Sequence, residues 1–423
     1  MPVTDEARIA GLPVSAIADA FGTPLYIYDG DVLAATYRRV REALHPKAGI
    51  FYSLKANPNV SVCAYLGRLG AGAETSSLAE LRIAQRAGIA AADTIFLGPG
   101  KTREELTACV RAGMAAIVAE NIDELTAIDD IAGAANRTQV PVILRVNPDF
   151  ASVGSGLSMG GKPRQFRMDI AVVRENHALL SKLSRLRVHG VHAYMGTRFL
   201  QHADIVHNTR EILATAEVLA DELGIPLETV DFGGGFGVAY FDNEEHLDLA
   251  ATTAGMNEAI DRFTRQHPDC RLILELGRYL TAMSGTYVVR ALYVKESMGH
   301  HFVVADGGTN HHMAAVGIGS FVKRNFPIHL LSRHDGAPRE YTVTGPLCTP
   351  NDVIGKKVSL PPVQPGDLIG VGRSGAYGPS ASPGLFLSHG FPAEVLVHQG
   401  KPYLIRERDR VEDILGRQRL VRF

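Results

Sequence analysis

Lys55 lies at the end of the short apolar run FYSLKANPN, residues 51–59. The length and composition of this run predict a buried β-strand that delivers the lysine into a polar turn. Desolvation at such a strand end favours the neutral amine, which can form an imine with an aldehyde cofactor. A lone strand-end lysine more often extends to solvent, so this chemistry is predicted only in combination with other motifs.

The run GGGFG, residues 233–237, follows the predicted strand ETVDF. Glycines lack Cβ atoms, so their N–H groups can turn toward a phosphate. A tight turn between a strand and a helix is the alternative, but it does not need three consecutive glycines. We therefore predict phosphate binding at Gly234, Gly235 and Gly237.

The elements that position these residues alternate between short β-branched runs and longer helical stretches from about residue 25 to 278. This pattern predicts a (β/α)8 TIM barrel, with PLYIYD entering from outside and eight strands left for the barrel. Active groups of such barrels lie at the carboxyl ends of the strands, so Lys55, Tyr194, the glycine run and Glu275 are expected to converge. The predicted barrel strands are GIFYSLK, GAETS, TIFLG, AAIVAE, VPVILRVN, RVHGVHAY, ETVDFG and LILELG.

After about residue 280, strands follow one another without intervening helices, which predicts a mostly antiparallel β-domain. We assign residues 29–280 to the barrel and residues 1–28 plus 281–423 to the β-domain. Residues 151–166, ASVGSGLSMGGKPRQF, form a long aperiodic segment and are predicted to be either a lid or a surface loop. The predicted β-domain strands are GTYVVRALYVKE, HFVVADGG, REYTVTGP, GDLIGVG and PAEVLVHQGKPYLIR.

Composition excludes several classes of protein. The 423 residues carry a formal net charge of -2 and no basic stripe, which argues against nucleic-acid binding. The amino terminus lacks the pattern of a secretory signal, and no run approaches the roughly 20 apolar residues that span a bilayer. Cys63, Cys109, Cys270 and Cys348 form no CxxC pair, so we predict no disulfide framework, no structural zinc site, and a cytoplasmic location.

A set of motifs resembles the fold-type III pyridoxal phosphate (PLP) decarboxylases, the family of diaminopimelate and ornithine decarboxylases, along nearly the whole chain. The resemblance implies PLP as cofactor, an alanine racemase-like barrel, and a β-domain that includes the first residues of the chain. The motifs, in family order, are HAYMGT at 192–197, DFGGGFG at 231–237, ELGR at 275–278, ADGG at 305–308, GPLCTPND at 345–352 and SGAYG at 374–378.

The resemblance also implies roles for individual residues. Lys55 stands where the family places its Schiff-base lysine, and Glu275 where a carboxylate keeps the pyridine nitrogen protonated so that the ring accepts electrons. Leu276 replaces the usual proline of that motif. The implied cofactor-binding residues are Lys55, Tyr194, Gly234, Gly235, Gly237, Glu275, Gly277, Arg278 and Tyr377.

Tyr194 stands where the family usually has a histidine stacked on the ring, so it can supply a π-face but no cation. His192 points the same way and is predicted to be a packing residue, with catalysis as the alternative. His311 and His312 have no HExxH motif or third ligand near them, so no metal is predicted.

Cys348 matches the family's catalytic cysteine, which is supplied across a dimer interface, so the resemblance implies a homodimer with shared active sites. A lone cysteine is otherwise usually an inert small hydrophobe. The implied substrate-binding residues are Arg278, Cys348, Thr349, Asp352 and Tyr377.

Decarboxylation is the reaction that these residues favour. Amino-acid racemases of this fold pair the ring nitrogen with an arginine, and Glu275 argues against them. A non-catalytic PLP-binding homologue is a second alternative. The joint presence of Lys55, Glu275 and Cys348 argues against it. The expected activity is a carboxy-lyase acting on a small or carrier-bound amino acid.

The substrate is less defined. Diaminopimelate decarboxylases usually have a glutamate after the cysteine, and ornithine decarboxylases an aspartate, whereas this chain has Thr349. GGKPRQF, GTNHHMAA, GPLCTPND and SGAYGPSASPGLFLSH resemble instead a subgroup of natural-product and exopolysaccharide (exosortase-associated) loci. That subgroup includes the butirosin-pathway decarboxylase, which acts on glutamate tethered to an acyl carrier protein. A free diamino acid (diaminopimelate, ornithine or lysine) or a siderophore intermediate remains the alternative.

Two arginines depart from the subgroup. Arg167 stands where the subgroup usually has glycine, and Arg198 stands where the subgroup usually has glutamine. They can bind an acidic substrate, bind a phosphopantetheine arm, or lie in solvent.

Overall fold

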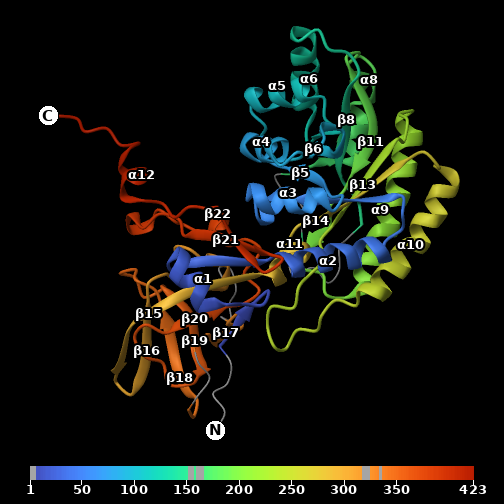
Figure 1. Ribbon diagram of the computed structural model, residues 1–423. Coiled ribbons are helices and arrows are strands. Elements are labelled where there is room, and N and C mark those ends of the chain that lie inside the picture. Colours follow the sequence, from blue (N-terminus) through green and yellow to red (C-terminus); the bar gives the residue numbers. More distant parts are fainter. Residues whose placement is uncertain (1–5, 151–156, 159–165, 317–323, 333–335) are drawn as a thin grey trace. The chain divides into compact units, whose positions relative to one another are not determined.

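The computed structural model of the protein describes residues 6–150, 157–158, 166–316, 324–332 and 336–423. The chain divides into two compact units (Figure 1). The barrel unit comprises residues 36–239 and 244–280, and the β-rich unit comprises the residues up to 35, residues 240–243 and those from 281 onward. Within the described ranges, none of the helices combines the length and apolarity that crossing a bilayer requires.

The barrel unit contains eight parallel strands that close on themselves through the pairing of β7 with β8. This confirms the predicted TIM barrel. The segment PLYIYD lies outside it, as expected, because β3 (Leu25–Asp29) pairs with strands of the β-rich unit. The barrel strands are β4 (Ala48–Ser53), β5 (Gly72–Thr75), β6 (Thr94–Phe96), β7 (Ala116–Ala119), β8 (Val140–Asn147), β11 (Leu186–His192), β13 (Thr229–Gly234) and β14 (Arg271–Leu276).

Helices connect these strands and begin at residues that cap them. The Ser77 hydroxyl accepts a hydrogen bond from the Glu80 N–H (3.2 Å) at the start of α4, and Gly88 follows the helix with a φ of +80°. The helices are α2 (Gly30–Ala43), α3 (Val60–Arg68), α4 (Leu78–Arg86), α5 (Arg103–Ala112), α6 (Ile122–Ala134), α7 (Ile170–Glu175), α8 (His177–Leu180), α9 (His202–Leu223), α10 (Leu249–Gln266) and α11 (Arg278–Thr281).

The interior of the barrel is layered. Phe51, Ile95, Val118, Ile143 and Ile273 belong to one buried apolar cluster. Because side chains alternate along a strand, residues two positions further toward the carboxyl ends face the same interior. Three of these five positions hold charged side chains, which form a polar layer above the apolar one: Glu120 after Val118, Arg145 after Ile143 and Glu275 after Ile273.

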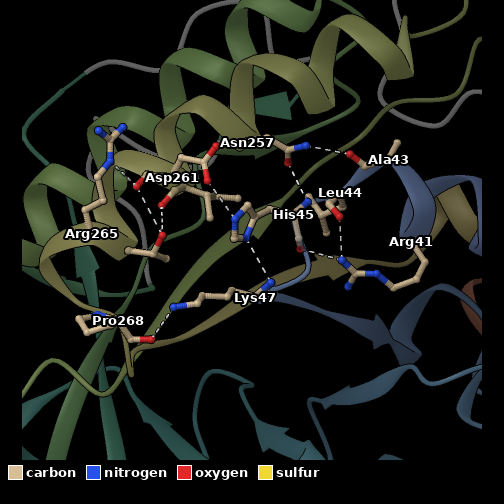
Figure 2. A network of polar contacts seen from close by, with 11 residues as sticks. Arg41, Ala43, Leu44, His45, Lys47, Asn257, Asp261, Arg265 and Pro268 are labelled. Atoms are coloured by element: carbon tan, nitrogen blue, oxygen red, sulfur yellow. Dashed lines mark hydrogen bonds and ion pairs between the residues drawn. The ribbon is translucent and has the colours of Figure 1, made fainter.

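A polar clamp at the amino end of β4 ties the first barrel strand to α10 (Figure 2). Arg41 donates to the carbonyl oxygens of Ala48 (2.5 Å), Leu44 (2.8 Å) and His45 (2.7 Å). Asn257 accepts from the His45 N–H (2.8 Å) and donates to a carbonyl of α2. Further contacts are His45 Nε2 with Asp261 Oδ1 (3.1 Å), Lys47 N–H to His45 Nδ1 (3.2 Å) and Lys47 Nζ to the Pro268 carbonyl (2.7 Å).

The β-rich unit is built on a mostly antiparallel sheet in the order β19-β18-β16-β15-β3-β21-β22, with β20 pairing both β15 and β17. β17 and β19 were not predicted, because β17 has three residues and β19 is interrupted by Lys356 and Lys357 and pairs irregularly. The strands are β15 (Gly285–Ser297), β16 (His300–Ala305), β17 (Ile328–Leu330), β18 (Arg339–Thr344), β19 (Val353–Leu360), β20 (Leu368–Val371), β21 (Ala393–His398) and β22 (Lys401–Arg406).

Candidate active site

Lys55 lies in a short 3-10 turn that directly follows β4, at the carboxyl end of the barrel. Its Nζ is 3.0 Å from Glu74 Oε2, and it lies 5.8 Å from the centroid of the Tyr194 ring. The Lys55 side chain is 38% exposed, whereas that of Glu74 is fully buried. The structure therefore places a buried carboxylate beside the Lys55 amine, a partner that the sequence did not reveal.

His192 is the last residue of β11 and Glu275 the second-last of β14, while Asp231 lies in the middle of β13, the strand between them. His192 is the register partner of Asp231, and Asp231 that of Ile273. All three polar side chains are buried, and their ligand atoms lie within 4.8 Å of one another. We call these three residues the acidic cluster.

Electrostatics differ within the acidic cluster. Burial acts to raise the pKa of Glu275, but His192 and the positive charges of Lys55 and Arg145 outweigh it and hold this pKa at about 2. Burial and the nearby Glu275 raise the pKa of Asp231 well above its usual value. Burial lowers the pKa of His192, so its imidazole is neutral near pH 7.

The remaining charges of the polar layer are paired outside the acidic cluster. Arg145 forms a buried ion pair with Glu120. Lys101 Nζ lies 2.5 Å from Glu124 Oε1, and both side chains are almost completely buried. Among the described residues, Glu275 therefore has no lysine or arginine as an ion-pair partner, unlike Glu74, Glu120 and Glu124.

Close backbone approach explains two of the predicted glycines. A Cβ atom on Gly235, whose φ is +85°, would lie 2.3 Å from the Gly196 carbonyl oxygen. A Cβ on Gly277 would lie 2.8 Å from the Cβ of Ala56, the residue after Lys55. Glycines therefore bring the ends of β13 and β14 against the neighbouring segments of the site. The Gly237 N–H already donates to the Phe199 carbonyl (2.8 Å).

Cys348 lies in the β-rich unit on a loop that a buried aspartate holds. The two carboxylate oxygens of Asp352 accept from the N–H groups of Thr309 (2.8 Å) and Leu347 (2.7 Å). Cys348 is exposed, whereas the other cysteines are buried. Burial raises the pKa of each of these thiols to about 12: Cys63, Cys109 and Cys270.

The other predicted residues fall into both units. Arg278 begins α11 and is separated from the end of β14 by Gly277 alone. Tyr377 lies in the β-rich unit and has a φ of +55°, which is uncommon for a residue other than glycine. The Ser374 hydroxyl at the start of that loop lies 2.8 Å from His312 Nε2, and His311 Nε2 lies 2.9 Å from the Gly390 carbonyl. Both histidines are thus engaged in hydrogen bonds.

Neither of the two unusual arginines lies freely in solvent. Arg167 is 9% exposed and donates from Nη1 to Asn147 Oδ1 (3.2 Å). Arg198 pairs with Glu244 (3.1 Å). The predicted lid falls largely outside the described residues; β9 (Leu157–Ser158), which lies within it, pairs with β12 (Gly196–Thr197).

Sequence reasoning missed Glu74 and Asp231 as parts of the site. Glu74 belongs to the predicted strand GAETS, and its inward position two residues after Gly72 was the available signal. Asp231 opens the motif DFGGGFG, and its place on the strand that leads to the glycines was the available signal.

The site fits the implied PLP. Within the described chain, Glu275 Oε1 is buried without a hydrogen-bond partner, as a carboxylate that receives a pyridinium N–H requires. Lys55 provides an accessible amine, and Tyr194 a ring face beside it. When bound, PLP supplies an electron sink for the electron pair that stays at Cα when CO₂ departs.

Comparisons with known proteins agree with this geometry. The family described as "Pyridoxal-dependent decarboxylase, pyridoxal binding domain" matches residues 31–282. The chain is 38% identical to the L-glutamyl-[BtrI acyl-carrier protein] decarboxylase of Niallia circulans, over 96% of either chain. It is 31% identical to the diaminopimelate decarboxylase of Pseudomonas fluorescens, over 97% of this chain and 96% of the relative.

A solved structure shares the fold over most of the chain. The diaminopimelate decarboxylase of Helicobacter pylori, complexed with L-lysine, has a TM-score of 0.85 and 28% identity, covering 95% of this chain and 98% of that one. The likeness includes both the barrel and the β-rich unit. The chain therefore belongs to the family of pyridoxal-dependent decarboxylases and is a PLP-dependent carboxy-lyase.

Proposed function

We propose that the protein decarboxylates an α-amino acid attached through its distal carboxyl group to a carrier protein or a similar group. The observation that carries this proposal is Thr349, a neutral residue directly after the exposed Cys348. Its hydroxyl accepts from the Asn351 N–H (3.3 Å), so it offers no charge to a distal amine or carboxylate. The 38% identity to a glutamyl-carrier-protein decarboxylase supports the same substrate class.

A free diamino acid is the second candidate, because diaminopimelate decarboxylases align with nearly the whole chain. Release of CO₂ should be compared between a carrier-bound glutamyl thioester and free diaminopimelate, ornithine, lysine and glutamate. We expect at least tenfold higher kcat/KM for the thioester. Higher kcat/KM for a free diamino acid would contradict the proposal.

A Thr349→Glu variant sharpens this comparison. The new carboxylate should improve turnover of a free diamino acid relative to the thioester, since it adds the missing charge. Thr349→Val is the matched control, because it changes the side chain without adding a charge. Equal effects of both variants would indicate that position 349 does not contact the substrate.

We propose the following roles for residues of the site. Lys55 would hold PLP covalently through its amine, Glu275 would accept from the ring N–H, and Tyr194 would offer its ring face to the cofactor. Cys348 or Lys55 would supply the proton for Cα. The phosphate is assigned to Gly234, Gly235, Gly237, Gly277, Arg278 and Tyr377, and the substrate to Arg278, Cys348, Thr349, Asp352 and Tyr377.

Borohydride reduction followed by peptide mapping tests the role of Lys55. We expect the label on Lys55 and none on Lys101, because Lys101 is buried against Glu124 and donates to the Val118 carbonyl (2.8 Å). Label on Lys101 or on another lysine would overturn the assignment. Lys55→Arg should abolish labelling and keep the charge beside Glu74.

We also propose a homodimer in which Cys348 serves the partner's barrel. Lys55→Ala and Cys348→Ala should each be nearly inactive. Random subunit exchange between them makes half of the dimers hybrids with one intact site, so activity should return to about a quarter of wild type. Absence of recovery after verified exchange would mean that Cys348 acts within its own chain or has no catalytic role.

A biosynthetic role in the cytoplasm completes the proposal. The four free cysteines support a reducing compartment. Cell fractionation with an antibody against the protein would test this, and recovery from an oxidising compartment would contradict it.

A further inference from the structure

The acidic cluster has more buried polar atoms than hydrogen-bond partners. Within the described residues, Glu275 Oε1, Asp231 Oδ2 and both ring nitrogens of His192 have none. His192 Nε2 is 3.5 Å from Glu275 Oε1, slightly beyond a good hydrogen bond. Two carboxylates this close and this deeply buried do not both ionise, because repulsion adds to the cost of desolvation.

The charges around the acidic cluster fix how many protons it holds. Lys55 faces Glu74, and Arg145 faces Glu120, so each of these cations is matched by a carboxylate outside the acidic cluster. With His192 neutral, one protonated carboxyl group leaves a single negative charge. One negative charge matches one pyridinium N–H.

The hydrogen bonds and the nearest charges together favour Asp231 over Glu275 as the protonated residue. Its Oδ1 accepts from the Gly233 N–H (2.9 Å), which leaves Oδ2 as the position for a hydrogen. Glu275 lies within the electrostatic influence of Lys55 and Arg145, which favour its ionised form. Asp231 experiences instead the negative charges of Glu275 and Glu74.

We propose that Asp231 is a positioning residue that acts as a neutral carboxylic acid, with its Oδ2–H directed at Glu275. Glu275 is then the single carboxylate of the acidic cluster, and its remaining oxygen is oriented toward the ring nitrogen of PLP. The orienting role rests on the proposed role of Glu275. The protonation of Asp231 does not depend on it and can be measured without turnover.

Infrared spectroscopy of the holoenzyme near neutral pH tests the protonation directly. Protein labelled with ¹³C in aspartate side-chain carboxyl groups should show a shifted carboxylic acid C=O band, and Asp231→Asn should remove that band. Asp306→Asn is the matched control, because burial also raises the pKa of Asp306, which lies in the β-rich unit. An aspartic acid band that survives in Asp231→Asn and is lost in Asp306→Asn would overturn the proposal.

Variants of Asp231 test the orienting role. Asn at this position keeps an acceptor for the Gly233 N–H and presents an amide N–H to Glu275, whereas Ala presents neither. We expect kcat of Asp231→Ala to be at least tenfold below that of Asp231→Asn, with the Kd for PLP within threefold between the two. The absorbance of bound PLP should change with pH in Asp231→Ala and follow wild type in Asp231→Asn. Equal kcat values for the two variants would contradict the orienting role.

The alternative to a proton on Asp231 is a divalent metal ion bound by the imidazole and the two carboxylates of the acidic cluster. Metal analysis of the purified holoenzyme distinguishes the two. Less than a tenth of an equivalent of any transition metal is expected. One equivalent per chain, lost in Asp231→Asn, would overturn the proposal.

Discussion

At the amino end of the barrel, the polar clamp of Arg41, His45 and Asn257 bonds to main-chain groups and to neighbouring side chains (Figure 2). At the carboxyl end, Asp231 and Glu275 keep buried oxygens that no described residue takes up. The clamp is partly exposed, yet its contacts join α2, β4 and α10. The acidic cluster is fully buried, yet its hydrogen-bonding capacity is incomplete.

This difference separates stability from chemistry within one barrel. Unsatisfied buried carboxyl groups destabilise a fold, so they are retained where a ligand completes them. Satisfied contacts at the opposite end stabilise the packing of the first barrel strand against α10. In TIM barrels, the amino ends of strands generally serve stability and the carboxyl ends carry activity.

The largest expected effect follows from changing Glu275. We expect Glu275→Gln to lower kcat by about 100-fold or more, because a neutral amide no longer stabilises the protonated ring nitrogen. The free energy of unfolding should change by less than about 1 kcal/mol, since shape and burial are kept. Steady-state kinetics and urea unfolding measure the two quantities. A kcat within twofold of wild type would show that Glu275 is structural.

The next prediction concerns the pH dependence of the free energy of unfolding. It involves His189, which lies on the same strand as His192. Burial, together with Arg187, lowers the pKa of His189 to about 4. Between about pH 6.5 and pH 4 the unfolded chain binds a proton that the folded chain does not, so stability falls as pH falls through this window. The expected slope is about 1.4 kcal/mol per pH unit.

His189→Gln should remove this share of the acid sensitivity, measured by urea unfolding at pH 7 and pH 4.5. His202→Gln is the control, because His202 is exposed at the start of α9. An unchanged pH dependence in His189→Gln would mean that the folded protein protonates this histidine readily.

A smaller effect is expected from the clamp. Arg41→Ala removes three hydrogen bonds to carbonyl groups, so the free energy of unfolding should fall by about 2 kcal/mol. The kcat of the folded protein should stay within twofold, because Arg41 lies at the opposite end of the barrel from Lys55. Arg38→Ala, an exposed position of the same helix, is the matched control. Loss of kcat without loss of stability would contradict the assignment of stability to the amino end of the barrel and of activity to the carboxyl end.

The smallest effect is expected at Lys47. Its Nζ donates to the Pro268 carbonyl (2.7 Å), but this contact is exposed, so Lys47→Ala should change the free energy of unfolding by about 0.5 kcal/mol or less. Thermal unfolding of Lys47→Ala and Arg41→Ala under the same conditions compares how much stability each variant loses. An effect as large as that of Arg41→Ala would show that the clamp acts as one cooperative unit.

Local patterns in the sequence determined most of the strands and the positions of Lys55 and Glu275 at strand ends. Alternating βα units predict a barrel because each unit buries one apolar strand and one helix face. The motifs also indicated the family and its cofactor. β19 escaped prediction because its lysines break the apolar pattern that identifies a strand.

Only the tertiary structure decided how the charges are shared. Lys55 is paired with Glu74, and Asp231 lies beside Glu275, because the pairing of β4 with β5 and of β13 with β14 brings these side chains together. Burial and the nearest charges set which group is ionised, and neither quantity is encoded in a local window of sequence. The same holds for the clamp, where His45 and Asn257 meet across more than 200 residues.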